Sequence, residues 1–215
     1  MKINKKMREY LDRYGKIPKD HKERIEYLIN ELRLKPSDLG KIRDKIQGIL
    51  DIRQKQISFI FYFTPDATPR ARYSRFTKAF YVKNALDYKS IFSEFVESCG
   101  DLDYITTPCE FHCKTFKPTP KAMNRHETFI AELGLIKDVS KPDWDNLGKT
   151  YSDMVQSKLL MDDFLIYKGT VEKFYSIRPR IEITIKYYTT HDSTYNQNRI
   201  LSILNRKGES NNANQ

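Results

Sequence analysis

The chain has few cysteines and no long apolar run, and each shortage excludes a class of protein. Its 215 residues include three cysteines, a small odd number that argues against a disulfide framework and suits a reducing compartment. The longest apolar stretch, ISFIFYF at 57–63, is too short to cross a bilayer, and the start MKINKK leads into no apolar signal-peptide core. We therefore expect a cytoplasmic protein without a membrane segment.

Two of the cysteines lie in the segment CEFHC at 109–113, a pattern that suggests zinc. In a β-strand, however, Cys109 and Cys113 would lie about 13 Å apart at roughly 3.3 Å per residue, and His112 would point to the other face. The two thiols could not then share one zinc ion. We favour core packing for both.

Negative charge is in short supply: 28 Asp and Glu stand against 38 Lys and Arg, which gives a formal net charge of +10 and a pI near 9.3. Such an excess suggests a polyanionic partner such as nucleic acid. Residues 1–56 hold 16 Lys and Arg against 9 Asp and Glu, and so contribute +7. We interpret them as a basic helical extension. The favoured reading is a solvated pair of helices that packs on the main domain or on a second subunit, and the weaker alternative is a helix-turn-helix that binds DNA.

Apolar periodicity supports this division of the chain. Helical spacing is seen in Lys22–Leu34 and again after Ser37, which can cap the second helix. From residue 57 the pattern predicts strands at 57–64, 79–83, 109–116, 165–175 and 180–188, with helices at 84–98 and 145–159. This order predicts an α/β (α+β) fold, a mixed sheet of about five strands with packed helices.

The main domain is expected at 57–190, with an insertion or flap at 117–140 that holds a helical stretch ending near Gly134. Residues 191–215 contain one short apolar turn and a polar end, GESNNANQ, so we expect a largely disordered tail.

The chemistry concentrates in KPDWDNLGKTYSD at 141–153 and in MDDF at 161–164. On a helix from Asp145, residues 145, 149 and 153 form one polar row, while Leu147, Tyr151 and Met154 face nearly the opposite way. Carboxylates of this kind suit Mg²⁺, which takes about two of them and keeps waters for a phosphate. The alternative is that these acids only cap helices and line surface loops. Trp144, between two of the acids, is expected to pack beneath the site.

A basic segment with interleaved rings, PRARYSRFT, occupies 69–77. This mixture suits a loop that grips phosphates and offers rings to an unpaired base, or else an ordinary solvated hairpin. The candidate DNA-binding residues are Arg70, Arg72, Arg75, Lys78 and Lys141.

The acidic motif, the later Asp-Asp pair and the basic segment together resemble the RusA family of Holliday junction resolvases over about residues 57–188. The resemblance implies a homodimeric endonuclease that uses Mg²⁺, with Mn²⁺ as a substitute, to resolve four-way junctions in DNA recombination and repair, a family common in phages and prophages. Position by position, it implies a catalytic set of Asp143, Asp145, Asp163 and Lys149, in which the three aspartates hold the metal. This sequence has Leu165 where the family commonly has Gln, and residues 1–56 match no part of the family pattern.

The expected helix 145–159 is about 20 Å long, which would put Asp163 at the opposite end from Asp143 and Asp145. We therefore predict either a shorter or broken helix or a site shared across a two-fold dimer. Two other functions stay open: a nuclease for other branched DNA, and a non-catalytic DNA-binding protein that uses its N-terminal helices.

Overall fold

The computed structural model describes residues 20–67, 72–74, 79–81, 87–156 and 158–212. The chain divides into two compact units, Met1–Asp51 and Ile52–Gln215. Among the described helices, none combines the length and the apolar character needed to cross a membrane.

The first unit contains α2 (His21–Glu31) and α3 (Pro36–Leu50). The Asp20 carboxylate accepts hydrogen bonds from two backbone amides of the first turn of α2 and so caps it. Helix α3 begins one residue before the expected cap Ser37, because Pro36 takes the first helical position and its fixed φ suits that place. No side chain of either helix is fully buried. Ile29 and Ile42 of the predicted apolar stripes are half-buried, and the other stripe residues are exposed: Ile25, Leu28, Leu32, Ile46, Ile49 and Leu50.

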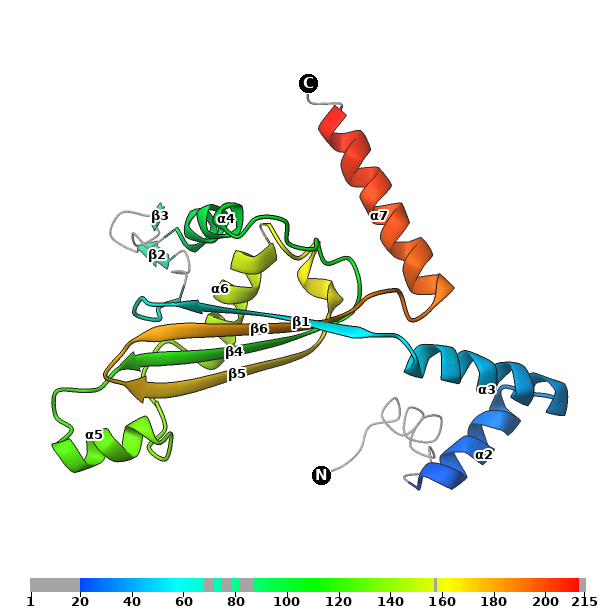
Figure 1. The fold of residues 1–215 in the computed structure, drawn as a ribbon, viewed down its shortest axis with the longest axis horizontal. Helices are drawn as coiled ribbons and strands as arrows, with labels where there is room; N and C mark the ends of the chain where they lie inside the picture. The colour runs from blue at the N-terminus through cyan, green and yellow to red at the C-terminus, as the bar shows by residue number, and fades with distance from the viewer. Residues whose placement is uncertain (1–19, 68–71, 75–78, 82–86, 157, 213–215) are drawn as a thin grey trace. The chain divides into compact units, whose positions relative to one another are not determined.

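The second unit is built on a four-stranded mixed sheet in the order β1-β6-β4-β5 (Figure 1). Its strands are β1 (Gln54–Phe61), β4 (Cys109–Pro118), β5 (Ile166–Ser176) and β6 (Arg180–Tyr188). β4 and β5 run parallel, and the other two pairings are antiparallel. The predicted mixed α+β fold is thus confirmed, with one strand fewer in the sheet. The strand expected at 79–83 instead forms β3 (Ala79–Tyr81), which pairs with β2 (Arg72–Ser74) in a separate hairpin.

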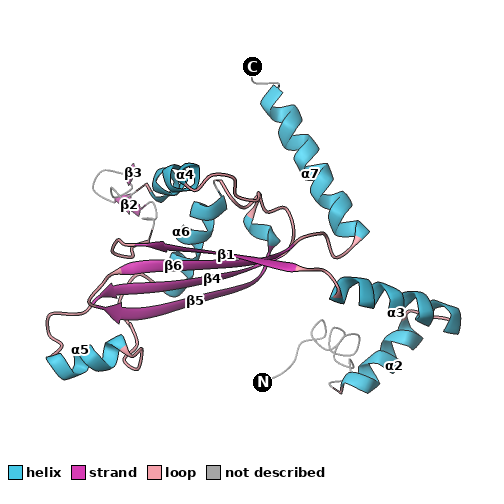
Figure 2. Cartoon of the chain, in the orientation of Figure 1, coloured by secondary structure: helices cyan, strands magenta, loops and turns pink. Residues whose placement is uncertain are grey.

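Strict alternation explains why the sheet buries one face. Ile181, Ile183 and Ile185 in β6 are fully buried, while the residues between them are half-buried on the other side. Helices α4 (Tyr88–Ser98) and α6 (Trp144–Gln156) both lie on the buried face (Figure 2). The rings of β1 pack against those of α4 at centroid distances between 5.0 and 6.1 Å, in edge-to-face arrangements.

Cys109 and Cys113 point into this core and are fully buried, so core packing is confirmed for both. Burial raises the pKa of each thiol to about 12. All three cysteines carry free thiols.

The segment expected as an insertion holds the short helix α5 (Arg125–Glu132), which Asn124 caps and which packs at the end of β5. Gly134 follows at φ +71°, a conformation that favours glycine, so the helix ends as expected.

The C-terminal segment differs from its prediction. Residues Thr194–Asn212 form one helix, α7, where a largely disordered tail was expected. The apolar turn is the reason: Ile200 is 4% exposed, and Ile203 and Leu204 pack against the same core, so the first half of the helix is fixed by burial.

Candidate active site on helix α6

Helix α6 presents the polar row that its spacing predicts. Leu147, Tyr151 and Met154 are buried, while Asp145 and Lys149 are exposed. The Tyr151 hydroxyl donates a hydrogen bond of 2.8 Å to the Asp66 carbonyl, which fixes the rotation of the helix beneath the sheet. The helix therefore turns its acids and its lysine outward from the core.

Gly148 lets α6 approach the sheet closely. A Cβ atom at this position would meet a methyl group of Val171, on β5, at 2.9 Å. Valine has a stiff χ1 angle, so it cannot turn aside easily. The absence of a side chain at 148 thus sets the distance between the strand and the middle of the polar row.

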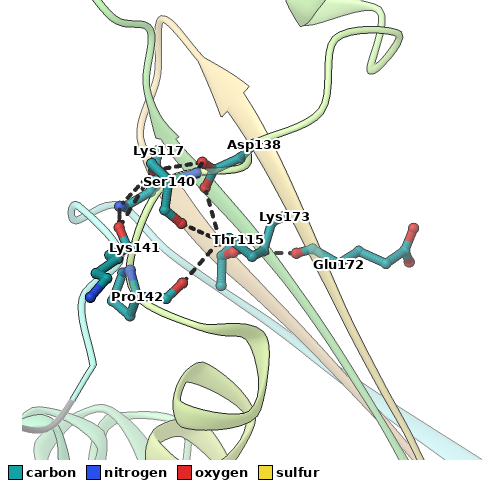
Figure 3. A network of polar contacts seen from close by, with 8 residues as sticks. All are labelled: Thr115, Lys117, Asp138, Ser140, Lys141, Pro142, Glu172 and Lys173. Atoms are coloured by element: carbon teal, nitrogen blue, oxygen red, sulfur yellow. Dashed lines mark hydrogen bonds and ion pairs between the residues drawn. The ribbon is translucent and has the colours of Figure 1, made fainter.

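The loop that leads into α6 is held by a half-buried lysine, as Figure 3 shows. The Lys173 ammonium, on β5, donates to the carbonyl oxygens of Ser140 and Pro142, the second at 2.9 Å. It also lies 3.9 Å from the carboxylate of Asp138, whose side chain is fully buried. Asp138 in turn accepts hydrogen bonds from the Ser140 amide and hydroxyl at 2.7 and 2.6 Å.

A second lysine holds the same loop from β4. The Lys117 ammonium donates to the Ser140 hydroxyl at 3.1 Å and to the Lys141 carbonyl (Figure 3). The peptide bond between Lys141 and Pro142 is cis. Two strands of the sheet therefore fix the backbone of 140–142, the three residues directly before Asp143.

Asp163 begins a single 3-10 turn, η1 (Asp163–Leu165), after the chain has folded back from the end of α6. The return is fixed by backbone hydrogen bonds that Ile105 exchanges with Leu159 and Met161, at 2.8 and 3.0 Å. As a result, η1 comes back into contact with α6.

The electrostatics of Asp163 record this position. Partial desolvation is the largest cause that raises its pKa, followed by a hydrogen bond with Asp162 and by the negative charges of Asp162 and Asp153. The ammonium of Lys149 acts in the opposite direction. Asp163, Asp153 and Lys149 of one chain are therefore within electrostatic reach of one another.

Helix α6 ends at Gln156 and not at residue 159, so it is shorter than expected. The alternative, a site shared across a two-fold dimer, stays a prediction. The structure brings together Asp163 and Lys149 of the predicted set. Asp143 and Asp145 are exposed at the start of the helix. Over the described ranges, no three His, Cys, Asp or Glu side chains gather at metal-binding spacing.

The predicted basic residues are placed only in part. Arg70, Arg75 and Lys78 lie outside the described residues, and Arg72 is described by its backbone, which pairs with Tyr81 in the hairpin. Lys141 is exposed beside the acidic motif. The expectation for Trp144 was wrong: the residue is 65% exposed, because it precedes Leu147, the first residue of α6 that is buried.

The sequence reasoning missed the network that holds the loop. One signal for it was available, because Lys173 aligns with the buried Thr115 in the β4–β5 pairing, a place where alternation predicts a core residue. A lysine at such a position needs buried polar partners. Here the partners are loop carbonyls and Asp138.

Comparison with known proteins assigns the family. A sequence profile described as endodeoxyribonuclease RusA matches residues 63–186, more than half of the chain. The chain belongs to the RusA family. The match includes the whole acidic motif, the Asp-Asp pair and the strands that carry Lys117 and Lys173. The fold is consistent with that family, and the N-terminal helical unit lies outside the matched region.

The chain is also similar to a relative in Bacillus subtilis (strain 168), "Uncharacterized protein YqaN". The two are 34% identical over 84 residues. The alignment covers 38% of this chain and 59% of that relative, so the chain spans less than two thirds of the curated relative that it matches.

Proposed function

We propose that this RusA-family protein is a Mg²⁺-dependent endonuclease that cuts branched DNA, with paired phosphodiester cuts at four-way junctions. The observation that carries the proposal is the arrangement at α6. Asp143 and Asp145 are exposed at its start, directly after a loop held by Lys117 and Lys173, and the charge of Lys149 acts on Asp163. A structural helix cap would not require a loop fixed from two strands.

The donor set fits a hard divalent cation. All the candidate ligands are carboxylates, and Mg²⁺ binds one or two of them while it keeps several waters, so a dense protein cage is not required. We propose Asp143, Asp145 and Asp163 as the metal-holding residues, with Mn²⁺ as a substitute metal. When bound, the cation would activate a water and neutralise charge on the scissile phosphate.

The chain's own residues would then orient the substrate. Lys149, on the same side of α6 as Asp145 and beside Asp163, would neutralise charge on the phosphate oxygens or on the leaving oxygen. The loop network keeps Asp143 at the start of the helix, where the positive end of the helix dipole favours anionic groups. Arg70, Arg72, Arg75, Lys78 and Lys141 would grip the DNA backbone, in keeping with the net charge of +10.

A four-way junction has two-fold symmetry, so two symmetric cuts require two active sites in a two-fold arrangement. We therefore propose a homodimer that acts in the cytoplasm in DNA recombination or repair, of host or phage origin.

The test is incubation of a labelled four-way junction and a matched linear duplex with the wild type and with Asp145→Asn, with and without Mg²⁺. We expect symmetric nicks in the junction from the wild type only, and at least about a hundredfold slower cleavage by the variant, because a group that stabilises developing charge is lost. The exposed loop residue Asp101 supplies a matched control, Asp101→Asn, which should cleave normally.

Two results would overturn parts of the proposal. Cleavage of other branched forms with equal rates would remove the junction preference but keep the nuclease. Tight binding without cleavage in Mg²⁺ or Mn²⁺ would make the protein a non-catalytic DNA-binding protein and direct attention to its N-terminal helices.

A further inference from the structure

A pocket of about 520 Å³ is lined by Phe164, the residue that directly follows Asp163 in the chain. Its walls come from η1, from the outer ends of β5 and β6 and from the first turns of α7. The residues that matter for its chemistry are Phe164, Tyr167, Tyr188, Tyr195, Asn196 and Arg199. Four Phe and Tyr rings, the His191 imidazole, the Arg199 guanidinium and the Asp192 carboxylate thus line one hollow, whose size is within the ordinary range for small-molecule sites.

Part of this wall is rigid. The rings of Tyr167 and Tyr188 stack at a centroid distance of 6.3 Å with 23° between their planes. The Tyr167 hydroxyl donates a hydrogen bond of 2.8 Å to Glu110, a half-buried acid on β4. This pair of rings therefore has its place before any ligand enters.

The other two rings are open. Phe164 is 46% exposed and Tyr195 is 71% exposed, although both line the pocket. Tyr195 and Arg199 are four residues apart on α7, so they share one face of the helix. Ile200, which is 4% exposed, anchors that part of α7 to the core and holds the two side chains at the pocket.

The place of the pocket indicates its ligand. Phe164 directly follows Asp163, so its Cα is about 3.8 Å from that of the proposed catalytic acid. A DNA strand whose phosphate lies at Asp163 would carry its neighbouring bases to the mouth of the pocket. In a continuous duplex those bases are paired and stacked, whereas unpairing costs least where the duplex is already interrupted.

We propose that this pocket accepts an unpaired nucleobase of a branched DNA strand, stacked on Phe164 and Tyr195, with Arg199 on an adjoining phosphate. Aromatic faces bind any base, and a guanidinium binds phosphate and also stacks on bases. The inference rests on the proposed nuclease function, because it uses the position of Asp163. It goes further by assigning a recognition site to the branch point.

The test measures binding without metal, so that no cleavage is required. The probe is a fluorescent oligothymidylate of about ten nucleotides, together with an abasic strand of the same length. We expect Tyr195→Ala and Phe164→Ala to raise the dissociation constant for oligothymidylate by about five- to a hundredfold, and Tyr195→Phe to keep wild-type affinity. The abasic strand should bind the wild type at least as weakly as oligothymidylate binds Tyr195→Ala, because it loses the contacts with both rings.

Tyr62, which is 75% exposed and outside the pocket, gives the matched control Tyr62→Ala. The proposal would be overturned if Tyr62→Ala lowered the affinity for oligothymidylate as much as Tyr195→Ala does. It would also be overturned if the wild type bound the abasic strand and oligothymidylate equally well. Conversion of a dimer to a monomer by Tyr195→Ala without a change in DNA affinity would overturn it as well, since the pocket would then receive a second copy of the chain.

The outcomes also separate the two proposals. Ring-dependent binding without junction cleavage would remove the nuclease function and keep the pocket. Metal-dependent cleavage of the junction, together with binding that does not change when the rings are removed, would keep the nuclease function and remove the proposed pocket site.

Discussion

The two parts of α6 that carry candidate acids are built in different ways. At its start, Asp143 and Asp145 are exposed, and the preceding loop is fixed by two lysines and a buried carboxylate. Further along, a chain reversal brings Asp162 and Asp163 back toward α6, where the charges of Asp153 and Lys149 act on Asp163. The hydrogen bonds at the start of the helix fix the backbone of the loop, whereas the chain reversal places several charged side chains close together. The position of Asp143 and Asp145 depends on a polar network that holds the preceding loop, whereas the position of Asp163 depends on the chain reversal after α6.

The strongest test of this comparison asks whether both parts of α6 serve one active site. Because Asp163 is beside Lys149 of its own chain, we expect a mixture of Asp145→Asn and Asp163→Asn subunits to stay inactive, with cleavage reduced at least about a hundredfold as in each variant alone. The measurement is junction nicking by subunits that have been unfolded and refolded together. A site shared across a dimer would instead restore about a quarter of wild-type nicking, since half of the dimers would be mixed and each would hold one intact site.

The network at the start of the helix is tested by Lys173→Met. We expect a loss of about 3 kcal/mol in the free energy of unfolding, because the buried Asp138 carboxylate would lose its cation and two loop carbonyls their donor. Chemical denaturation measures it.

The matched control is Lys114→Met on the neighbouring strand. Its ion pair with Glu172 spans 4.0 Å, and both side chains are about half exposed, so the loss should stay below about 1 kcal/mol. Equal losses from the two lysines would show that the network contributes no more than a surface pair. Adding Asp138→Asn to Lys173→Met should recover part of the loss.

The smallest effect is expected where α6 touches the sheet. Gly148→Ala should destabilise the fold by about 1 kcal/mol, because the new methyl group would meet Val171 at 2.9 Å and outweigh the better helix propensity of alanine. Val171→Ala in the same chain should relieve the contact. Gly48→Ala in α3, where nothing lies within 4 Å, should instead stabilise its helix by about 0.5–1 kcal/mol. Thermal unfolding measures these changes. A Gly148→Ala variant more stable than the wild type would contradict the close approach of α6 to the sheet.

Periodicity predicted most elements because each buries one face of a regular structure. Alternation gave β6 at its exact bounds, Arg180–Tyr188, and the helical spacing gave the outward row on α6. It failed for α7, because a short apolar turn followed by polar residues has no local signal for a long helix. Periodicity also led us to count the strand near residue 80 as part of the main sheet, whereas it pairs with β2 in a separate hairpin. The sequence of a strand does not determine which strand it pairs with.

The sequence by itself determined the family, the acidic motif, the excess of positive charge and the burial of the two strand cysteines. These follow from residue type and spacing along a single element. Only the tertiary structure decided that Lys117 and Lys173 hold the loop before Asp143, that η1 returns to contact α6, and that Phe164, Tyr167, Tyr188 and Tyr195 line one pocket. Each of these joins segments far apart in the chain, and such contacts are set by packing, which no local pattern encodes.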